Sequence, residues 1–238
     1  MIEEIVRKNF ELVDENEEVK KIFGYIYGEK EFPIVTRNKK AFGVIDERSL
    51  IKSKILGNEK IKNFAVGVPK IDATYSLNKA REVMIKSGSE ILIVTSEKEI
   101  VGYIRLIDIL REVGVQKTAR DVMKYVEPLD ERDTVSEAIN VMRRSNRKFI
   151  PVLSNKKFSG VVGVRKILPF ISTKEKSKGY AEKTSLLETV LAGLVDEIPV
   201  CKEDKEISKI IDFIEESNAV AVCRGNEYLG LIEEVDLL

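Results

Sequence analysis

The sequence predicts an α/β fold made of four similar repeats, each with the element order strand, helix, strand, strand, helix. Three features carry this prediction: a glycine recurs in the same context, a helical pattern precedes it, and short apolar runs flank it. The glycines lie 59, 58 and 70 residues apart, at Gly43, Gly102, Gly160 and Gly230. The helical patterns begin 24, 25, 25 and 23 residues before them, at Val19, Leu77, Val135 and Ile207. Two anchors that keep register four times indicate an internal repeat.

The third repeat shows how each element is recognised. Apolar residues recur every three to four positions from Val135 to Met142, which is the spacing of one helix face, and Asp133 or Thr134 is placed to cap that helix. The runs FIPVLS and FSGVVGV that follow have the length of strands, and the polar residues 155–157 between them indicate a tight hairpin. The segment RKILPFI then returns to a helical pattern.

Domain organisation follows from the size of the repeat. A repeat of about 60 residues is too small to bury both faces of its sheet, so we expect the repeats to pair. The expected boundaries are 1–60, 61–116, 117–172 and 173–238, with a polar linker at about 172–190, and the expected pairs are 1–116 and 117–238. Two pairs in one chain can close a disc-like array, which leaves a monomer and a homodimer both open.

Composition excludes several classes of protein. The 238 residues carry 40 Lys and Arg against 40 Asp and Glu, with no basic excess of the kind that nucleic-acid and membrane-surface binders show. There is no histidine, and the two cysteines form no CxxC pattern, which argues against imidazole chemistry, a zinc site and a disulfide framework. No apolar run approaches the ~18 residues of a membrane span, and the acidic N-terminus is unlike a signal peptide. We therefore expect a cytoplasmic protein, and the many Lys and Glu residues hint at a thermophile.

The layout resembles the CBS domain family, in which Gly, two hydrophobic residues, Ser or Thr, two variable residues and Asp precede an apolar helix. A proline in the second strand, as in FPIV and FIPV here, is also typical of the family. The resemblance covers nearly the whole chain. It implies tandem CBS repeats paired into two Bateman modules, similar in layout to the gamma subunit of AMP-activated protein kinase.

The resemblance also implies a ligand. In this family, the cleft between paired repeats can hold an adenosyl ligand such as AMP, ADP, ATP or S-adenosylmethionine. The Asp accepts hydrogen bonds from ribose hydroxyls, and the Ser or Thr at a helix N-terminus contacts a phosphate. The partner repeat contributes apolar and backbone contacts to adenine.

Carried over position by position, the ribose acid is present in repeats two and four. Repeat two has Asp108, with Arg105 at the Ser/Thr position and Lys30 of repeat one expected across the cleft. An arginine there can bind phosphate with two hydrogen bonds. This cleft is the stronger of the two predicted ligand sites.

Repeat four has Asp236 but Glu233 at the phosphate position, and Lys148 and Phe149 of repeat three are expected across its cleft. Phe149 is placed to stack on a purine. Either a ligand without phosphate or compensation of Glu233 by Arg165 and Lys166 would suit this cleft. Repeats one and three have Ser49 and Lys166 at the acid position and Asp46 and Gly163 at the Ser/Thr position, so repeat one is expected to be empty or differently used.

Purely structural roles are the alternative for Asp108, Asp236 and Phe149. An Asp one turn into a helix is favourable simply through the helix dipole, which would account for Asp108 and Asp236 without a ligand. Phe149 can equally belong to the core.

The function that the resemblance implies is a regulatory module that senses adenine nucleotide and signals to an unidentified protein partner. It would need no cofactor beyond that effector. The alternatives are a ligand-free scaffold for protein–protein interaction and a binder of S-adenosylmethionine. Because no constellation of catalytic groups is found, we do not expect an enzyme.

Overall fold

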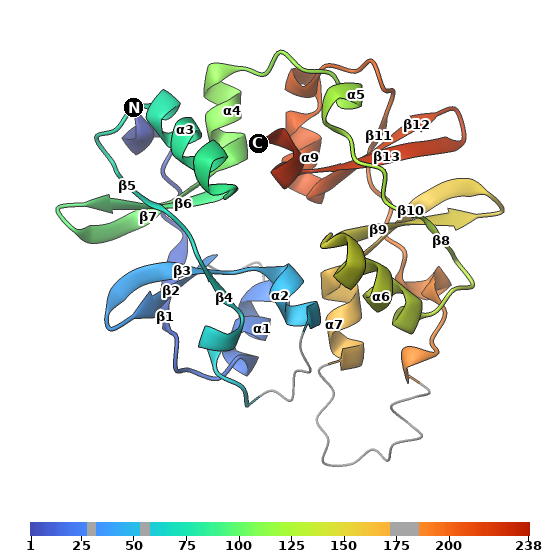
Figure 1. Cartoon of the computed structure of the whole chain (residues 1–238), viewed down its shortest axis with the longest axis horizontal. Helices are drawn as coiled ribbons and strands as arrows, with labels where there is room; N and C mark the ends of the chain where they lie inside the picture. Colours follow the sequence, from blue (N-terminus) through green and yellow to red (C-terminus); the bar gives the residue numbers. More distant parts are fainter. Residues whose placement is uncertain (28–31, 53–57, 172–185) are drawn as a thin grey trace.

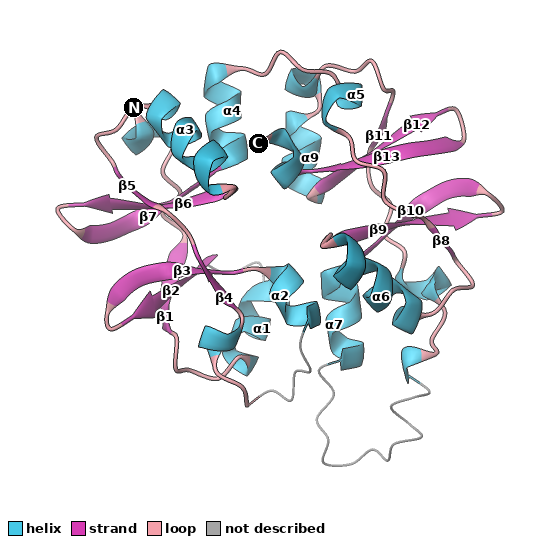
Figure 2. Ribbon diagram, viewed as in Figure 1, coloured by secondary structure: helices cyan, strands magenta, loops and turns pink. Residues whose placement is uncertain are grey.

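The computed structural model describes residues 1–27, 32–52, 58–171 and 186–238. Viewed down its shortest axis the molecule is disc-like, with repeats one and two on the left and repeats three and four on the right (Figure 1). The helices gather along two opposite edges of the disc, and the hairpins point outward along the other two (Figure 2). None of the helices in the described ranges is long and apolar enough to cross a membrane.

Repeats one to three have the predicted element order, and repeat four differs in ending with a 3-10 turn in place of the last helix. Repeat one consists of β1 (Phe10–Asp14), α1 (Lys20–Tyr27), β2 (Phe32–Arg37), β3 (Lys40–Ile45) and α2 (Glu47–Lys52). Repeat two consists of β5 (Lys70–Asp72), α3 (Leu77–Ser87), β6 (Ile91–Ser96), β7 (Glu99–Arg105) and α4 (Leu106–Val113). Repeat three consists of β8 (Leu129–Asp130), α6 (Val135–Ser145), β9 (Phe149–Ser154), β10 (Lys157–Gly163) and α7 (Val164–Ile171). Repeat four consists of β11 (Val200–Cys201), α9 (Ile211–Ser217), β12 (Ala219–Arg224), β13 (Glu227–Glu233) and a 3-10 turn over Glu234–Leu237.

Within every repeat, the first two strands pair in parallel through a helical crossover and the last two form an antiparallel hairpin. The predicted hairpin of repeat three turns through Asn155 and Lys156, which have positive φ values of 51° and 66°, as a type I′ turn requires. Thr134 is the cap of α6: its hydroxyl accepts a hydrogen bond from Glu137 N, and the Glu137 carboxylate reaches back to Thr134 N.

The repeated glycines are explained by the way the repeats pair. The residues that precede the first strand of each repeat, its lead-in segment, run alongside the third strand of the partner repeat. Repeat two supplies β4 (Ala65–Gly67), which pairs with β3, and an added Cβ at Gly43 would lie 1.8 Å from Val66 O. In the other three clefts an isolated antiparallel β-bridge joins the lead-in segment to the residue after the repeated glycine. These bridges are Arg7–Tyr103, Asp196–Val161 and Lys124–Leu231. A side chain at the glycine would block the partner's backbone.

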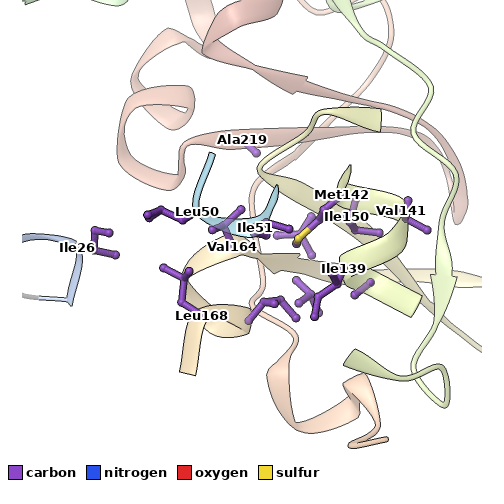
Figure 3. Packing of buried hydrophobic residues seen from close by; sticks show 14 of the residues in the cluster. Ile26, Leu50, Ile51, Ile139, Val141, Met142, Ile150, Val164, Leu168 and Ala219 are labelled. Atoms are coloured by element: carbon purple, nitrogen blue, oxygen red, sulfur yellow. The ribbon is translucent and has the colours of Figure 1, made fainter. Parts of the chain in front are cut away.

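The two pairs are joined through shared cores. One core combines helices α2 of repeat one with α6 and α7 of repeat three, and Figure 3 shows Leu50 and Ile51 packed among Ile139, Met142 and Val164. A second core joins α4 of repeat two to α9 of repeat four. Because each core spans both pairs, the disc is one packed body rather than two modules on a tether.

Two sequence predictions fall on residues that lie outside the described ranges. These are the ligand contact at Lys30 and most of the polar linker, residues 172–185.

Candidate ligand-binding clefts

The four clefts have the same construction. The third strand of one repeat runs beside the lead-in segment of its partner. The third residue of the following helical turn contacts that segment in repeats one to three, whereas in repeat four it contacts Arg147, which lies outside the lead-in segment. These third residues are Ser49, Asp108, Lys166 and Asp236, which are the positions that the family signature assigns to the ribose acid. The structure surrounds each of them differently.

In repeat two, an arginine of the partner repeat binds Asp108. Arg7 Nε lies 3.1 and 2.9 Å from the two carboxylate oxygens, and Arg7 Nη2 lies 2.6 Å from Oδ1. Only 9% of the Asp108 side chain is exposed, and its Oδ2 also accepts a hydrogen bond from Arg105 N at 2.8 Å. The hydrogen bonds that Arg7 donates to Asp108, together with its ion pair with Glu215, raise the pKa of Arg7 above its ordinary value. Asp108 therefore caps α4 and holds Arg7 across the cleft.

Arg105 faces a different partner from the one predicted. Its guanidinium pairs with Glu234 of repeat four, and Glu234 Oε1 accepts a further hydrogen bond from Ile107 N at 3.2 Å. Burial raises the pKa of Glu234. Burial alone would lower the pKa of Arg105, but the negative charge of Glu234 outweighs this effect and the pKa of Arg105 is raised. This pair crosses from one module to the other.

In repeat four, Asp236 is also bound by an arginine, Arg147 of repeat three, through two hydrogen bonds of 2.7 and 2.6 Å. Arg147 Nε lies 3.2 Å from Glu233 Oε1, so one cation serves two carboxylates. Glu233 is fully buried, and burial raises its pKa despite Arg147 and Lys148 nearby. The compensation of Glu233 that we predicted from Arg165 and Lys166 thus comes from Arg147 instead.

An open cavity of about 460 Å³ lies in the cleft of repeat three. Phe149, Val164 and Ile198 form apolar walls, and the cavity is also lined by Lys148, Arg165, Lys166, Asp196, Glu197 and Asn218. The Phe149 ring lies over Gly163, where an added Cβ would approach Phe149 Cε1 to 2.9 Å. Gly163 stands at the family's Ser/Thr position, so the missing side chain makes the space that the ring occupies.

A second cavity of about 370 Å³ lies in the cleft of repeat one, which we expected to be empty or differently used. The charge of Asp46 is met by Arg48 Nε, 2.9 Å from each carboxylate oxygen. Ser49 Oγ donates to backbone carbonyls of Asp46 and Phe64, at 2.6 and 2.7 Å. This cavity and the one in repeat three share four lining residues, Glu47, Lys148, Arg165 and Asn218.

Two of the shared residues bind across the module boundary. Lys148 Nζ lies 3.1 Å from Glu90 Oε1 of repeat two, and Arg165 Nη2 lies 2.8 Å from Glu47 Oε1 of repeat one. Burial lowers the pKa of Lys148, but the charge of Glu90 and neighbouring carboxylates outweighs it and the pKa is raised. Glu90 Oε2 is buried without a hydrogen-bond partner among the described residues.

The predicted ligand residues are thus divided between open and filled clefts. Lys148, Phe149, Arg165 and Lys166 come together around one cavity. The backbone N–H groups of Lys148 and Phe149 also face Glu233 of repeat four, at 3.5 and 3.4 Å, on the side where the sequence placed them. Asp108 and Asp236 lie apart from this cavity in ion pairs, and Arg105, paired with Glu234, lines the cavity of repeat one. Sequence reasoning missed Arg7 and Arg147. Arg147 directly precedes Lys148, which was already assigned to a cleft, whereas the only signal for Arg7 was its positive charge.

The described residues line the clefts with apolar side chains and with charges of both signs. They contain no group of three or more Cys, Asp or Glu side chains that could hold a metal ion. The clefts offer apolar walls, cations and carboxylates fixed between two repeats, which suits an amphipathic anion.

Part of the sequence matches the model of a known protein family. The family model of the CBS domain matches residues 65–115 and 119–173, whereas no curated protein matches the chain. The two matched segments, which fall in repeats two and three, resemble CBS domains. CBS-domain proteins are generally regulatory modules rather than catalysts.

Two solved structures extend the likeness of fold to the whole chain. Protein MJ1225 from Methanocaldococcus jannaschii, a proposed archaeal homologue of γ-AMPK, has a TM-score of 0.79 at 14% identity, covering 98% of this chain and 97% of that one. A conserved protein from Pyrococcus horikoshii has a TM-score of 0.63 at 16% identity, covering 99% and 96%. The predicted α/β fold of tandem CBS repeats is confirmed.

Proposed function

We propose that the chain is a regulatory module that binds an adenosyl ligand in the cleft of repeat three and passes the signal to a separate protein. The observation that carries this proposal is the 460 Å³ cavity, where four residues predicted for ligand contact converge on one space. Its volume is in the range of small-molecule sites, which run from about 300 to 1,000 Å³.

The walls of the cavity match the parts of a nucleotide. Phe149 and Ile198 offer flat and apolar surface to a purine. Lys148, Arg165 and Lys166 place three cations around the same space, where a phosphate would accept charge-assisted hydrogen bonds. Four carboxylates, Glu47, Asp196, Glu197 and Glu216, also line the cavity, so the charge of its lining does not by itself favour AMP, ADP or ATP over S-adenosylmethionine.

Binding at Asp108, Arg105 and Asp236 stays a prediction, as does the contribution of Lys30. A ribose that reaches Asp108 must displace Arg7, and one that reaches Asp236 must displace Arg147. Each replacement breaks at least two charge-assisted hydrogen bonds in a partly buried site, which makes these clefts weaker candidates than the open one.

The regulatory output follows from the position of Lys148 and Arg165. A phosphate in the cavity would compete with Glu90 and Glu47 for these two cations, and both pairs link the modules. A ligand shifts an equilibrium only by its different affinity for the two states, and here that difference lies in the contacts that its phosphate takes over. The protein partner would respond to the altered packing of the modules.

Isothermal titration calorimetry with AMP, ADP, ATP and S-adenosylmethionine tests the proposal. We expect at least one of the three nucleotides to bind with one site per chain in the micromolar range. Phe149→Leu should weaken that ligand about tenfold because the stacking surface is lost, while Phe158→Leu, in the same hairpin but outside the cavity, should not.

A ligand-free interaction scaffold is the second candidate. It is favoured by Arg7 and Arg147, which fill the two clefts that keep the family's acid. If all four ligands fail to bind the wild-type protein, the sensor proposal is wrong and the scaffold takes its place.

A further inference from the structure

The clefts of repeats two and three contain the same cross-cleft ion pair with the charges exchanged. In repeat two the lead-in residue is Arg7 and the helix residue is Asp108. In repeat three the lead-in residue is Asp196 and the helix residue is Lys166, with Lys166 Nζ 3.0 Å from Asp196 Oδ1. The correspondence is structural, because Arg7 and Asp196 make the same backbone bridge to the residue after the repeated glycine.

The exchange places a carboxylate in the cleft of repeat three on the opposite wall. Asp108 is held by two nitrogens of Arg7 and is 9% exposed, whereas Asp196 pairs with a single lysine nitrogen and is 51% exposed. Asp196 lines the open cavity, so an oxygen of its carboxylate remains accessible to a ligand.

The backbone fixes Asp196 in this place. Asp196 N donates to Val161 O at 2.8 Å, and Val161 N donates to Asp196 O at 2.9 Å. An added Cβ at Gly160 would lie only 2.4 Å from Asp196 O, so the lead-in segment is seated directly on β10. These contacts use only backbone atoms of Asp196, which leaves the side chain replaceable without moving the wall.

We infer that Asp196 is the residue that recognises the ribose of the ligand in repeat three, in place of the acid that this repeat lacks. A carboxylate can accept hydrogen bonds from both hydroxyls of a ribose, and Lys166 beside it then faces the phosphate side of the cavity. Ribose recognition in this cleft thus comes from the lead-in segment of repeat four. The inference rests on the proposed function, because it assumes that an adenosyl ligand occupies the cavity.

The test compares AMP with 2′,3′-dideoxy-AMP by calorimetry on the full chain. Hydrogen bonds to a charged group predict that the wild type prefers AMP by at least tenfold, about 1.4 kcal/mol. Asp196→Asn should lose most of this preference while still binding the dideoxy compound as the wild type does. Asp212→Asn, which changes an exposed acid outside the cavity, is the control and should keep the preference. Circular dichroism of each variant checks that the fold is intact.

The outcomes separate the inference from the proposal beneath it. If the wild type binds AMP and Asp196→Asn keeps the full preference for the ribose, the inference is wrong and the proposed function stands. If the wild type binds neither compound, both the inference and the sensor proposal fall.

Discussion

Replacing Asp108 by Asn separates a structural role of this acid from a ligand-binding role. The substitution keeps the shape of the side chain and an oxygen that can accept from Arg105 N, so the cap of α4 survives. It removes the charge that binds Arg7 across the cleft. Breaking a buried ion pair on one side typically costs 3–5 kcal/mol.

The expected cost here is smaller. Arg7 is 26% exposed and keeps its second partner Glu215, so the charge left behind is neither fully buried nor alone. We therefore expect a loss of about 2 kcal/mol in the free energy of unfolding. At about 2–4 °C per kcal/mol for a chain of this size, the melting temperature should fall by roughly 4–8 °C.

Thermal unfolding followed by circular dichroism measures this shift. Asp212→Asn is the control, because Asp212 also pairs with an arginine but is 72% exposed, and a surface change of this kind stays within about 0.5 kcal/mol. The reasoning is refuted if Asp108→Asn melts with the wild type and at the same time abolishes nucleotide binding, since Asp108 would then be a ribose acceptor and not a clamp.

Three further predictions follow from the cleft geometry. Burial raises the pKa of Glu233 in the folded state, so its contribution to stability is present below the ordinary value of 4.5 and is lost as the pH rises above it. In urea unfolding the wild type should therefore lose stability relative to Glu233→Gln as the pH is raised from 4.5, and a relative gain would contradict this. Gly160→Ala presses a methyl group against Asp196 O and should lower the free energy of unfolding by about 1–3 kcal/mol. Gly193→Ala, where an added Cβ meets no atom within 4 Å, is the control and should lower it by less than about 1 kcal/mol. Equal melting temperatures of the two variants would contradict the close contact between the lead-in segment and β10. Lys166→Ala should weaken ATP by severalfold and leave adenosine unchanged in calorimetry, and an equal effect on both would remove Lys166 from the phosphate site.

The fold could be predicted from the sequence because its signals are local and repeated. The glycine recurs because a neighbouring backbone occupies the space of a side chain, as at Gly43 and Gly160. The helix of repeat three begins where its capping residues predict, at Thr134. Such features depend on residues within one repeat or on a single close contact, so a pattern of spacing is enough to reveal them.

The clefts were less predictable because long-range charge pairing decides them. Arg7 binds a residue 101 positions away and Arg147 one 89 positions away, and with 40 cations and 40 anions in the chain no spacing rule selects these pairs. The backbone of Phe149 lies beside Glu233 of repeat four, as expected, but the absence of a side chain at Gly163 lets its ring lie in the cleft of its own repeat. The residue types were informative, whereas the cleft that each one enters depends on packing.

The most direct test of the account is a crystal structure of the full chain grown with saturating AMP. The account predicts the purine against Phe149 in the cavity of repeat three, with the pairs Arg7–Asp108 and Arg147–Asp236 intact. Nucleotide bound at Asp108 or Asp236, with its arginine displaced, would contradict it.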